Sequence, residues 1–129
     1  MKVYFIGAGP GDPELITVKA QKLINRCPII LYAGSLVPRA IFADVEDCAE
    51  LILDTASMDL EQIMQQVLSA ADSGKDVARV HSGDPSVYGA IGEQIRRLEQ
   101  LGIDYEVIDT DNPMSRALRA YLRKRERLG

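Results

Sequence analysis

The stretch that decides the fold lies near the start of the chain and runs Val3-Tyr4-Phe5-Ile6-Gly7-Ala8-Gly9-Pro10-Gly11-Asp12-Pro13. An apolar run leads into three glycines spaced two residues apart, and an acidic residue and a proline follow. A buried parallel strand that enters a tight turn explains this pattern. Because open α/β sheets bind ligands at the carboxyl ends of their strands, the stretch predicts a ligand site at the end of the first strand.

The alternation of strand and helix continues along the chain. Apolar runs predict strands at residues 2–7, 28–33, 51–53, 76–81 and 103–108. Helical periodicity follows each of them, and proline or glycine stands at several of the expected helix ends. The predicted fold is therefore α/β: a three-layer, doubly wound, five-stranded and mainly parallel sheet with helices on both faces, Rossmann-like or flavodoxin-like.

The predicted helices differ in how their ends are marked. The first ends near residue 26, and a short helix is expected over residues 38–44 after Pro38. Ser57 is the predicted cap of the next helix, which continues to about residue 73. The first helix carries a predicted apolar stripe made of Leu15, Val18, Ala20, Leu23 and Ile24.

Composition limits the classes of function. The 129 residues suit one domain, and no apolar run approaches the roughly 20 residues of a membrane helix. No secretion signal is visible at the N-terminus, so a cytoplasmic protein is expected, without a membrane partner. The cysteines, Cys27 and Cys48, form no C-x-x-C motif or Cys/His cluster, which predicts two ordinary thiols and no metal site.

The charge is unevenly distributed. Residues 109–129 hold six Lys/Arg and three Asp/Glu, a net +3, and the other nine bases and sixteen acids give residues 1–108 a net −7. An acidic body repels phosphates, so nucleic acid is not an expected partner. The basic segment has helical apolar periodicity, which favours a helix with a solvated basic face over a nucleic-acid-binding arm.

The first glycine turn differs from the dinucleotide-binding fingerprint G-x-G-x-x-G. Its third glycine comes one residue early, and Asp12, which stands in the fingerprint's place, would repel a pyrophosphate. The second strand ends in Tyr32-Ala33-Gly34, which offers no carboxylate for a ribose hydroxyl. A neutral or cationic nucleoside suits the loop better than NAD. The alternative is a tight turn that merely packs the first helix on the sheet.

A second strand-to-helix turn, Ser82-Gly83-Asp84-Pro85, follows the fourth strand. Strands one and four commonly flank the switch point of a doubly wound sheet, so the two glycine turns can face one crevice. Asp84 either accepts a hydrogen bond from a ligand or caps the helix that Pro85 begins.

Aromatic and imidazole side chains stand in or beside these turns. The single histidine, His81, has the pKa of a general base, but without a visible partner a satisfied structural histidine is the favoured interpretation. Tyr32, Ser35 and Tyr88 either line a pocket or, for the two tyrosines, pack their rings and leave the hydroxyls wet.

Taken together and in order, these motifs resemble the tetrapyrrole methylases. The segments that carry the resemblance are Val3–Pro13, Leu15–Val18, Leu31–Val37, Asp54–Ala56 and Val77–Ala90. The resemblance is strongest to the branch that methylates a corrin-ring carbon of precorrin-4 in cobalamin biosynthesis. It implies S-adenosylmethionine as the methyl donor, a tetrapyrrole as the substrate, and two α/β domains, usually in a homodimer, with the cofactor between the domains.

The family's binding regions can be carried over only onto matching positions of this chain. The resemblance implies that the cofactor is bound by Gly7, Gly9, Pro10, Gly11, Asp12, Ser82, Gly83, Asp84 and Tyr88. It implies that the tetrapyrrole lies near Tyr32, Ser35 and Leu36. It requires no catalytic nucleophile and no metal, because methyl transfer from a sulfonium depends mainly on positioning.

The resemblance stops near residue 107. Residues 108–113 replace the turn that the family has at this point, and the basic helix that follows matches nothing in it. We therefore expect residues 1–107 to form a methylase-like domain that residues 108–129 complete, as a monomer or a homodimer. Such a truncated or engineered half is expected to show little or no catalysis alone. The alternatives are a structural fragment or chimera without a ligand, and an enzyme that becomes active through dimerisation.

Overall fold

A computed structural model of the protein describes residues 1–8, 12–33, 37–82 and 91–108. The strands in this part are β1 (Lys2–Gly7), β2 (Ile29–Ala33), β3 (Leu51–Asp54), β4 (Val77–His81) and β5 (Asp104–Ile108). The helices are α1 (Val18–Arg26), α2 (Leu60–Asp72) and α3 (Gly92–Leu101), and two short 3-10 helices are η1 (Pro13–Leu15) and η2 (Arg39–Phe42).

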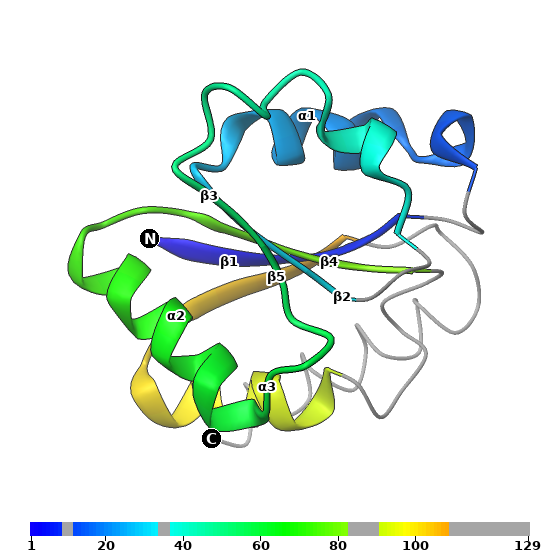
Figure 1. The fold of residues 1–129 in the computed structure, drawn as a ribbon. Coiled ribbons are helices and arrows are strands. Elements are labelled where there is room, and N and C mark those ends of the chain that lie inside the picture. The colour runs from blue at the N-terminus through cyan, green and yellow to red at the C-terminus, as the bar shows by residue number, and fades with distance from the viewer. Residues whose placement is uncertain (9–11, 34–36, 83–90, 109–129) are drawn as a thin grey trace.

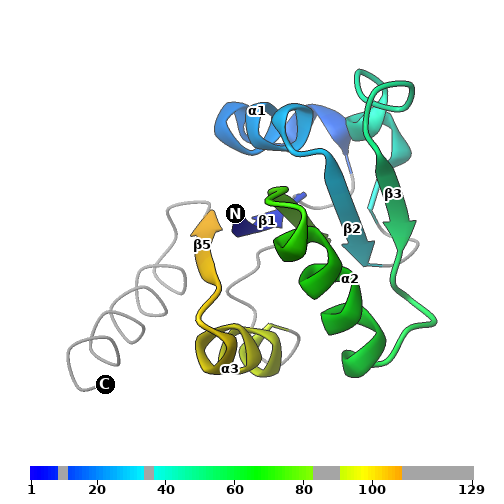
Figure 2. The ribbon, with the colours of Figure 1, turned by 90° about the vertical axis from the view of Figure 1, so that its left-hand side faces the viewer.

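The five strands form one sheet in the order β3-β2-β4-β1-β5. Every neighbouring pair is parallel. One face of the sheet is covered by α1 and η2, and the other by α2 and α3 (Figures 1 and 2). The predicted α/β fold with helices on both faces is thus confirmed, and β3 and β5 are the edge strands.

The two faces of the sheet follow from the alternation of side chains along each strand. On the α1 face, a buried cluster joins the sheet to α1 and η2, and its strand residues include Tyr4, Ile6, Ile30, Tyr32, Ala78 and Val80. On the α2/α3 face, a second cluster joins the sheet to α2 and α3, and its strand residues include Val3, Phe5, Ile29, Leu31 and Val77. The sheet is therefore buried on both sides at its centre, as a parallel sheet requires.

Two predictions for the first helical region are wrong. Leu15 and Val18, placed on the buried stripe, are 59% and 71% exposed. Leu15 belongs to η1, and the extended residue Ile16 separates η1 from α1, so one helical period does not continue through both. Val18 is the first residue of α1, where Thr17 caps the helix by accepting a hydrogen bond from the Ala20 N–H at 3.1 Å.

The start of α2 also differs from the prediction. Asp59, and not Ser57, is the cap: its carboxylate accepts from the Gln62 N–H at 2.8 Å. The Gln62 side chain accepts in return from the Asp59 N–H at 3.0 Å, which completes a capping box. Downstream of Pro38, the expected helix of residues 38–44 is the shorter 3-10 helix η2.

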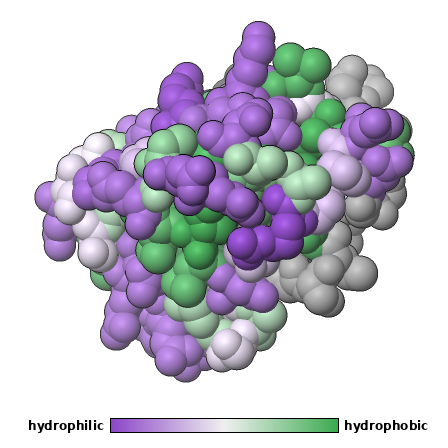
Figure 3. Space-filling view, turned by 45° about the horizontal axis from the view of Figure 1, so that its top comes forward, coloured by the Kyte–Doolittle hydropathy of each residue, from purple (hydrophilic) through white to green (hydrophobic). Residues whose placement is uncertain are grey.

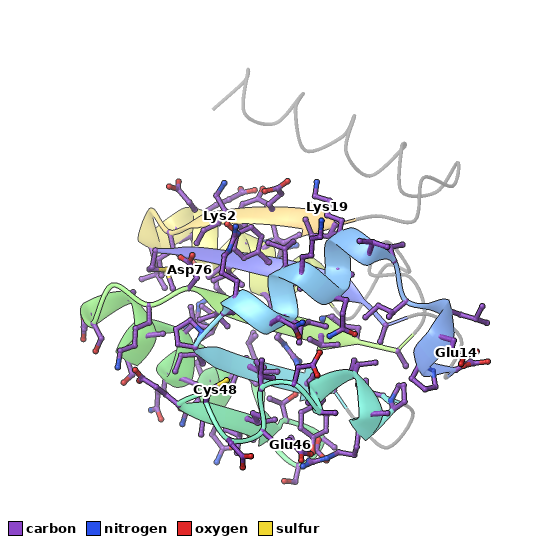
Figure 4. All side chains as sticks on the ribbon, turned by 90° about the horizontal axis from the view of Figure 1, so that it is seen from above. Lys2, Glu14, Lys19, Glu46, Cys48 and Asp76 are labelled. Carbon is purple, nitrogen blue, oxygen red and sulfur yellow. The ribbon has the colours of Figure 1, made fainter. Side chains whose placement is uncertain are left out.

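The surface around α1 is mainly hydrophilic, with hydrophobic residues visible between the polar ones (Figure 3). Lys2 and Lys19 lie on the same side of the molecule beside β5, and each is 3.7 Å from a carboxylate oxygen of Glu106 (Figure 4). No helix within the described residues is long and apolar enough to cross a membrane.

Candidate functional site

The candidate site begins with the convergence of three strand ends. In the sheet register, His81 of β4 lies beside Gly7 of β1 and beside Ala33 of β2. The Ala8 N–H donates to the His81 carbonyl at 2.7 Å, which extends the β1–β4 pairing by one step. The ends of β1 and β4, from which the two predicted glycine turns begin, therefore lie side by side.

The helices that follow these three strands lie on opposite faces of the sheet (Figure 1). After β1 and β2 it continues to α1 and η2 on one face, and after β4 it continues to α3 on the other (Figure 1). A strand whose connection goes to the opposite face from those of its neighbours marks a topological switch point, where α/β sheets bind ligands. In this sheet, a switch point lies on each side of β4, between β4 and β1 and between β4 and β2. We call the group formed by Gly7, Ala33, His81 and Ser82 the central carboxyl edge.

Four of the predicted binding residues lie within the described part of the chain. Gly7 and Ser82 lie at the central carboxyl edge, where Gly7 is buried and Ser82 is half-buried. Asp12 is exposed, and its carboxylate caps η1 by accepting from the Glu14 N–H at 2.9 Å. The other predicted residues lie outside the described residues: Gly9, Pro10, Gly11, Ser35, Leu36, Gly83, Asp84 and Tyr88.

Tyr32, the remaining predicted residue, is buried on the α1 face. Its hydroxyl accepts from Nη1 of Arg39 at 2.8 Å, and its ring lies 5.2 Å from that of Phe42. The Tyr32 carbonyl accepts from Thr55 through both the backbone N–H at 2.9 Å and the Oγ1 hydroxyl at 3.2 Å. This geometry matches the packing alternative for Tyr32 better than a direct contact with a ligand.

His81 is buried, with 6% of its surface exposed, and its ring stacks on Phe5 at a centroid distance of 6.4 Å. Its Nε2 atom is buried and has no hydrogen-bond partner within residues 1–8, 12–33, 37–82 and 91–108. For this atom the prediction of a satisfied structural histidine is wrong. Burial, with help from the nearby charge of Arg79, lowers the pKa of His81 to about 3, so the imidazole is neutral at pH 7.

Arg79 lies two residues before His81 on the same face of β4, and only 3% of it is exposed. Its Nε donates to the Gln94 side-chain oxygen of α3 at 3.0 Å, and its Nη1 donates to the Leu31 carbonyl at 3.1 Å. Burial lowers its pKa to about 10, against the opposing effect of Asp54, so it stays charged at pH 7. Sequence reasoning did not single out this residue, although one charge within an apolar strand is a signal that could have drawn attention to it.

Residues 2–109 match the family model of the tetrapyrrole (corrin/porphyrin) methylases. The chain is 63% identical over 108 residues to a precorrin-4 C(11)-methyltransferase of Pseudomonas aeruginosa, and the match covers 84% of this chain and 42% of that relative. The chain thus spans less than half the length of this relative.

Solved structures are similar over the same region. A cobalt precorrin-4 methyltransferase matches with a TM-score of 0.77 and 47% identity, over 84% of this chain and 45% of that one. A uroporphyrin-III C-methyltransferase from Thermus thermophilus, complexed with S-adenosylhomocysteine, matches with a TM-score of 0.69 and 34% identity, over 84% and 44%.

Proposed function

Because the chain belongs to the tetrapyrrole methylase family, we propose that its central carboxyl edge is the S-adenosylmethionine-binding part of a precorrin-4 C11-methyltransferase. The observation that carries the proposal is the meeting of Gly7, His81 and Ala33 at the switch points on either side of β4. Two glycine turns leave the sheet from this place, which is where α/β sheets bind nucleotides.

The described residues fit such a cofactor. Gly7 and Ala33, the neighbours of His81, are small, so a ligand can approach the main chain there. The Nε2 atom of His81 is a buried polar atom of the kind that a bound ligand satisfies. A neutral imidazole does not repel a sulfonium, whereas a histidinium would.

S-adenosylmethionine, when bound, supplies an activated methyl group. The work left to the protein is to orient the donor and the acceptor carbon in line and to keep them close together. For this chain we propose that the two glycine turns bind the cofactor. We also propose that the segment around Ser35 and Leu36 lies toward the tetrapyrrole, and that the hydrogen bond from Arg39 to the Tyr32 hydroxyl helps to hold this segment in place.

The matched region is under half the length of the relatives. We therefore propose cofactor binding, with little or no methyl transfer, as the activity of residues 1–108 by themselves. Precorrin-4 is the substrate proposed for an assembly that also supplies the rest of the tetrapyrrole site.

Calorimetric titration with S-adenosylhomocysteine tests this proposal. We expect saturable heat from the parent chain and binding at least about tenfold weaker for two variants. Gly9→Val blocks the approach of the ligand to the main chain, and Asp84→Ala removes one hydrogen bond to a charged group, which is sufficient for that change. Cys48→Ser is the matched control, because Cys48 is exposed and its chain segment bonds to the start of β2, at the opposite end of the sheet.

A parent chain that gives no heat would contradict the proposed function and leave a structural domain without a ligand. Methyl transfer to precorrin-4 by the chain alone would contradict the proposal that residues 1–108 bind the cofactor with little or no methyl transfer. In that case the mass of the active species, measured by native mass spectrometry, decides whether a dimer completes the site.

A further inference from the structure

We propose that His81 is a positioning residue for the cofactor, and that its Nε2 atom forms a hydrogen bond with the nucleoside part of the bound molecule. This inference rests on the proposed function and adds a residue that the glycine turns did not reveal. It follows from three properties of His81: its position in the sheet, its missing partner and its charge.

The position of His81 is central. β4 is the middle strand of the sheet, and His81 is its last residue, between Gly7 on β1 and Ala33 on β2. At this level of the three strands, only the imidazole has side-chain atoms that form hydrogen bonds, since the neighbours are glycine and alanine. The ring is held in place by stacking on Phe5.

The missing partner argues against a purely structural role. A buried polar atom without a hydrogen bond destabilises the folded state, and Nε2 is such an atom among the described residues. Phenylalanine would fill a similar volume and keep the stacking on Phe5. A histidine at this place therefore weakens the apo fold unless something else satisfies its ring nitrogen, and a ligand at the central carboxyl edge would do so.

The surroundings of His81 favour a hydrogen bond made by an uncharged imidazole. The guanidinium of Arg79 lies on the same face of β4, where Gln94 of α3 and the Leu31 carbonyl of β2 hold it, and Asp54 acts on it from the end of β3. Burial, and to a lesser degree this buried cation, lowers the pKa of His81 and keeps it in its neutral form. A neutral imidazole offers one donor and one acceptor, which suits the hydroxyl and ring-nitrogen groups of a nucleoside.

The first experiment uses His81 as its own probe, because it is the only histidine of the chain. In the chain labelled with ¹⁵N-histidine, the imidazole nitrogens give one set of signals. We expect addition of S-adenosylhomocysteine to shift the Nε2 signal, with saturation at the same concentration as the calorimetric heat. Heat without a shift of this signal overturns the inference and leaves the proposed function intact.

The second experiment uses substitution. We expect His81→Phe to weaken S-adenosylhomocysteine binding roughly five- to tenfold, the loss of one neutral hydrogen bond. His81→Gln, whose amide reaches nearly the same position, should stay within about threefold of the parent. Tyr105→Phe is the control, because Tyr105 also packs on Phe5 but comes from the edge strand β5.

Melting of the variants without ligand completes the test. We expect His81→Phe to melt at or above the temperature of the parent, because it removes a buried polar atom that lacks a partner. A large fall in melting temperature for both His81→Phe and His81→Gln would show that the fold itself uses the imidazole, and would overturn the inference. A parent chain without saturable heat overturns the proposed function and this inference together.

Discussion

The two faces of the sheet are built differently, although both are buried at the centre. On the α1 face, polar atoms stay at the rim: the hydroxyls of Tyr4 and Tyr32 accept from Arg26 at 3.1 Å and from Arg39 at 2.8 Å, and both arginines are exposed. On the α2/α3 face, polar groups lie within the core. Of the buried polar residues in the described part of the chain, Arg79 and His81 on β4 and Gln94 on α3 lie on this side.

This difference fits the proposed division between stability and cofactor binding. The α1 face has the composition of an ordinary core, so its contribution is hydrophobic burial and close packing. The α2/α3 face places a charge and an imidazole along β4, in a line that ends at the central carboxyl edge. Buried charges are costly unless they are bonded. We infer that the polar groups on this side prepare the binding edge, and that the apolar face compensates for their cost.

The largest expected effect tests the contribution of the α1 face to stability. Ile30 is fully buried on this face, and Ile30→Ala should reduce the free energy of unfolding by about 2–5 kcal/mol, through lost burial and a residual cavity. Urea denaturation measures the change. Ile30→Val, with an expected cost of about 1 kcal/mol, is the matched control. If Ile30→Ala cost no more than Ile30→Val, the apolar face would not be the main source of stability.

The next effect tests the buried charge on the other face. Gln94→Leu removes the acceptor of Arg79 Nε and leaves that guanidinium N–H buried without a partner. The expected loss of stability is about 2–4 kcal/mol, close to that of breaking a buried charged pair. Urea denaturation is again the measurement.

Replacing both partners separates the charge from the packing. In Arg79→Met/Gln94→Leu, the buried charge and its side-chain acceptor are both removed, and only the Leu31 carbonyl loses a donor, so much of the stability lost in Gln94→Leu should return. A double variant as unstable as the single one would mean that α3 packs poorly on any apolar partner. The contrast between the two faces would then not be electrostatic.

The two faces of the sheet also differ in how much of their structure can be predicted from the sequence. Apolar runs and glycine turns are sufficient to predict the strands and the α/β class, because these depend on local patterns. The strand order could not be predicted, because it depends on contacts between segments far apart in the chain. The cap of α2 was missed because Ser57 and Asp59 are both good capping residues, and only the geometry shows that Asp59 directly precedes the helix.

The polar core was largely invisible in the sequence. The sequence of residues 76–81 predicts a strand, but nothing in it shows that Arg79 bonds to Gln94, fifteen residues later. His81 stands out as the single histidine, yet whether its ring nitrogens have hydrogen-bond partners is a property of the folded chain. The candidate site was therefore located from its turns, and its side-chain chemistry became apparent only in three dimensions.

A smaller effect concerns pH and His81. The pKa of His81 is about 3 in the folded chain, against an ordinary value of 6.5. Between pH 3 and pH 6.5, the unfolded chain therefore binds a proton that the folded chain does not bind. The folded state therefore loses stability relative to the unfolded state as the pH falls from about 6.5 toward 3, because only the unfolded chain takes up the proton in this range. Between pH 7.5 and pH 5, the parent should lose about 2 kcal/mol more than His81→Phe.

Urea denaturation of both chains at the two pH values measures this difference, and the lower limit of pH 5 keeps most carboxylates ionised. Parallel losses in the two chains would mean that the imidazole is open to water in the folded state. The polar core on the α2/α3 face would then not reach the central carboxyl edge.

The smallest effect compares helix ends on the two faces. Thr17 caps α1 through one hydrogen bond, whereas Asp59 and Gln62 bond reciprocally at the start of α2. Thr17→Ala should cost about 0.5–1 kcal/mol and Asp59→Ala about 1–2 kcal/mol in urea denaturation, with Ser57→Ala near zero as the control. The capping box of α2 satisfies two backbone N–H groups and the Thr17 cap satisfies one, so α2 should depend more on its cap than α1 does. Equal costs at Thr17 and Asp59 would show that the two helices are held equally by packing, and that the contrast between the faces ends at the sheet.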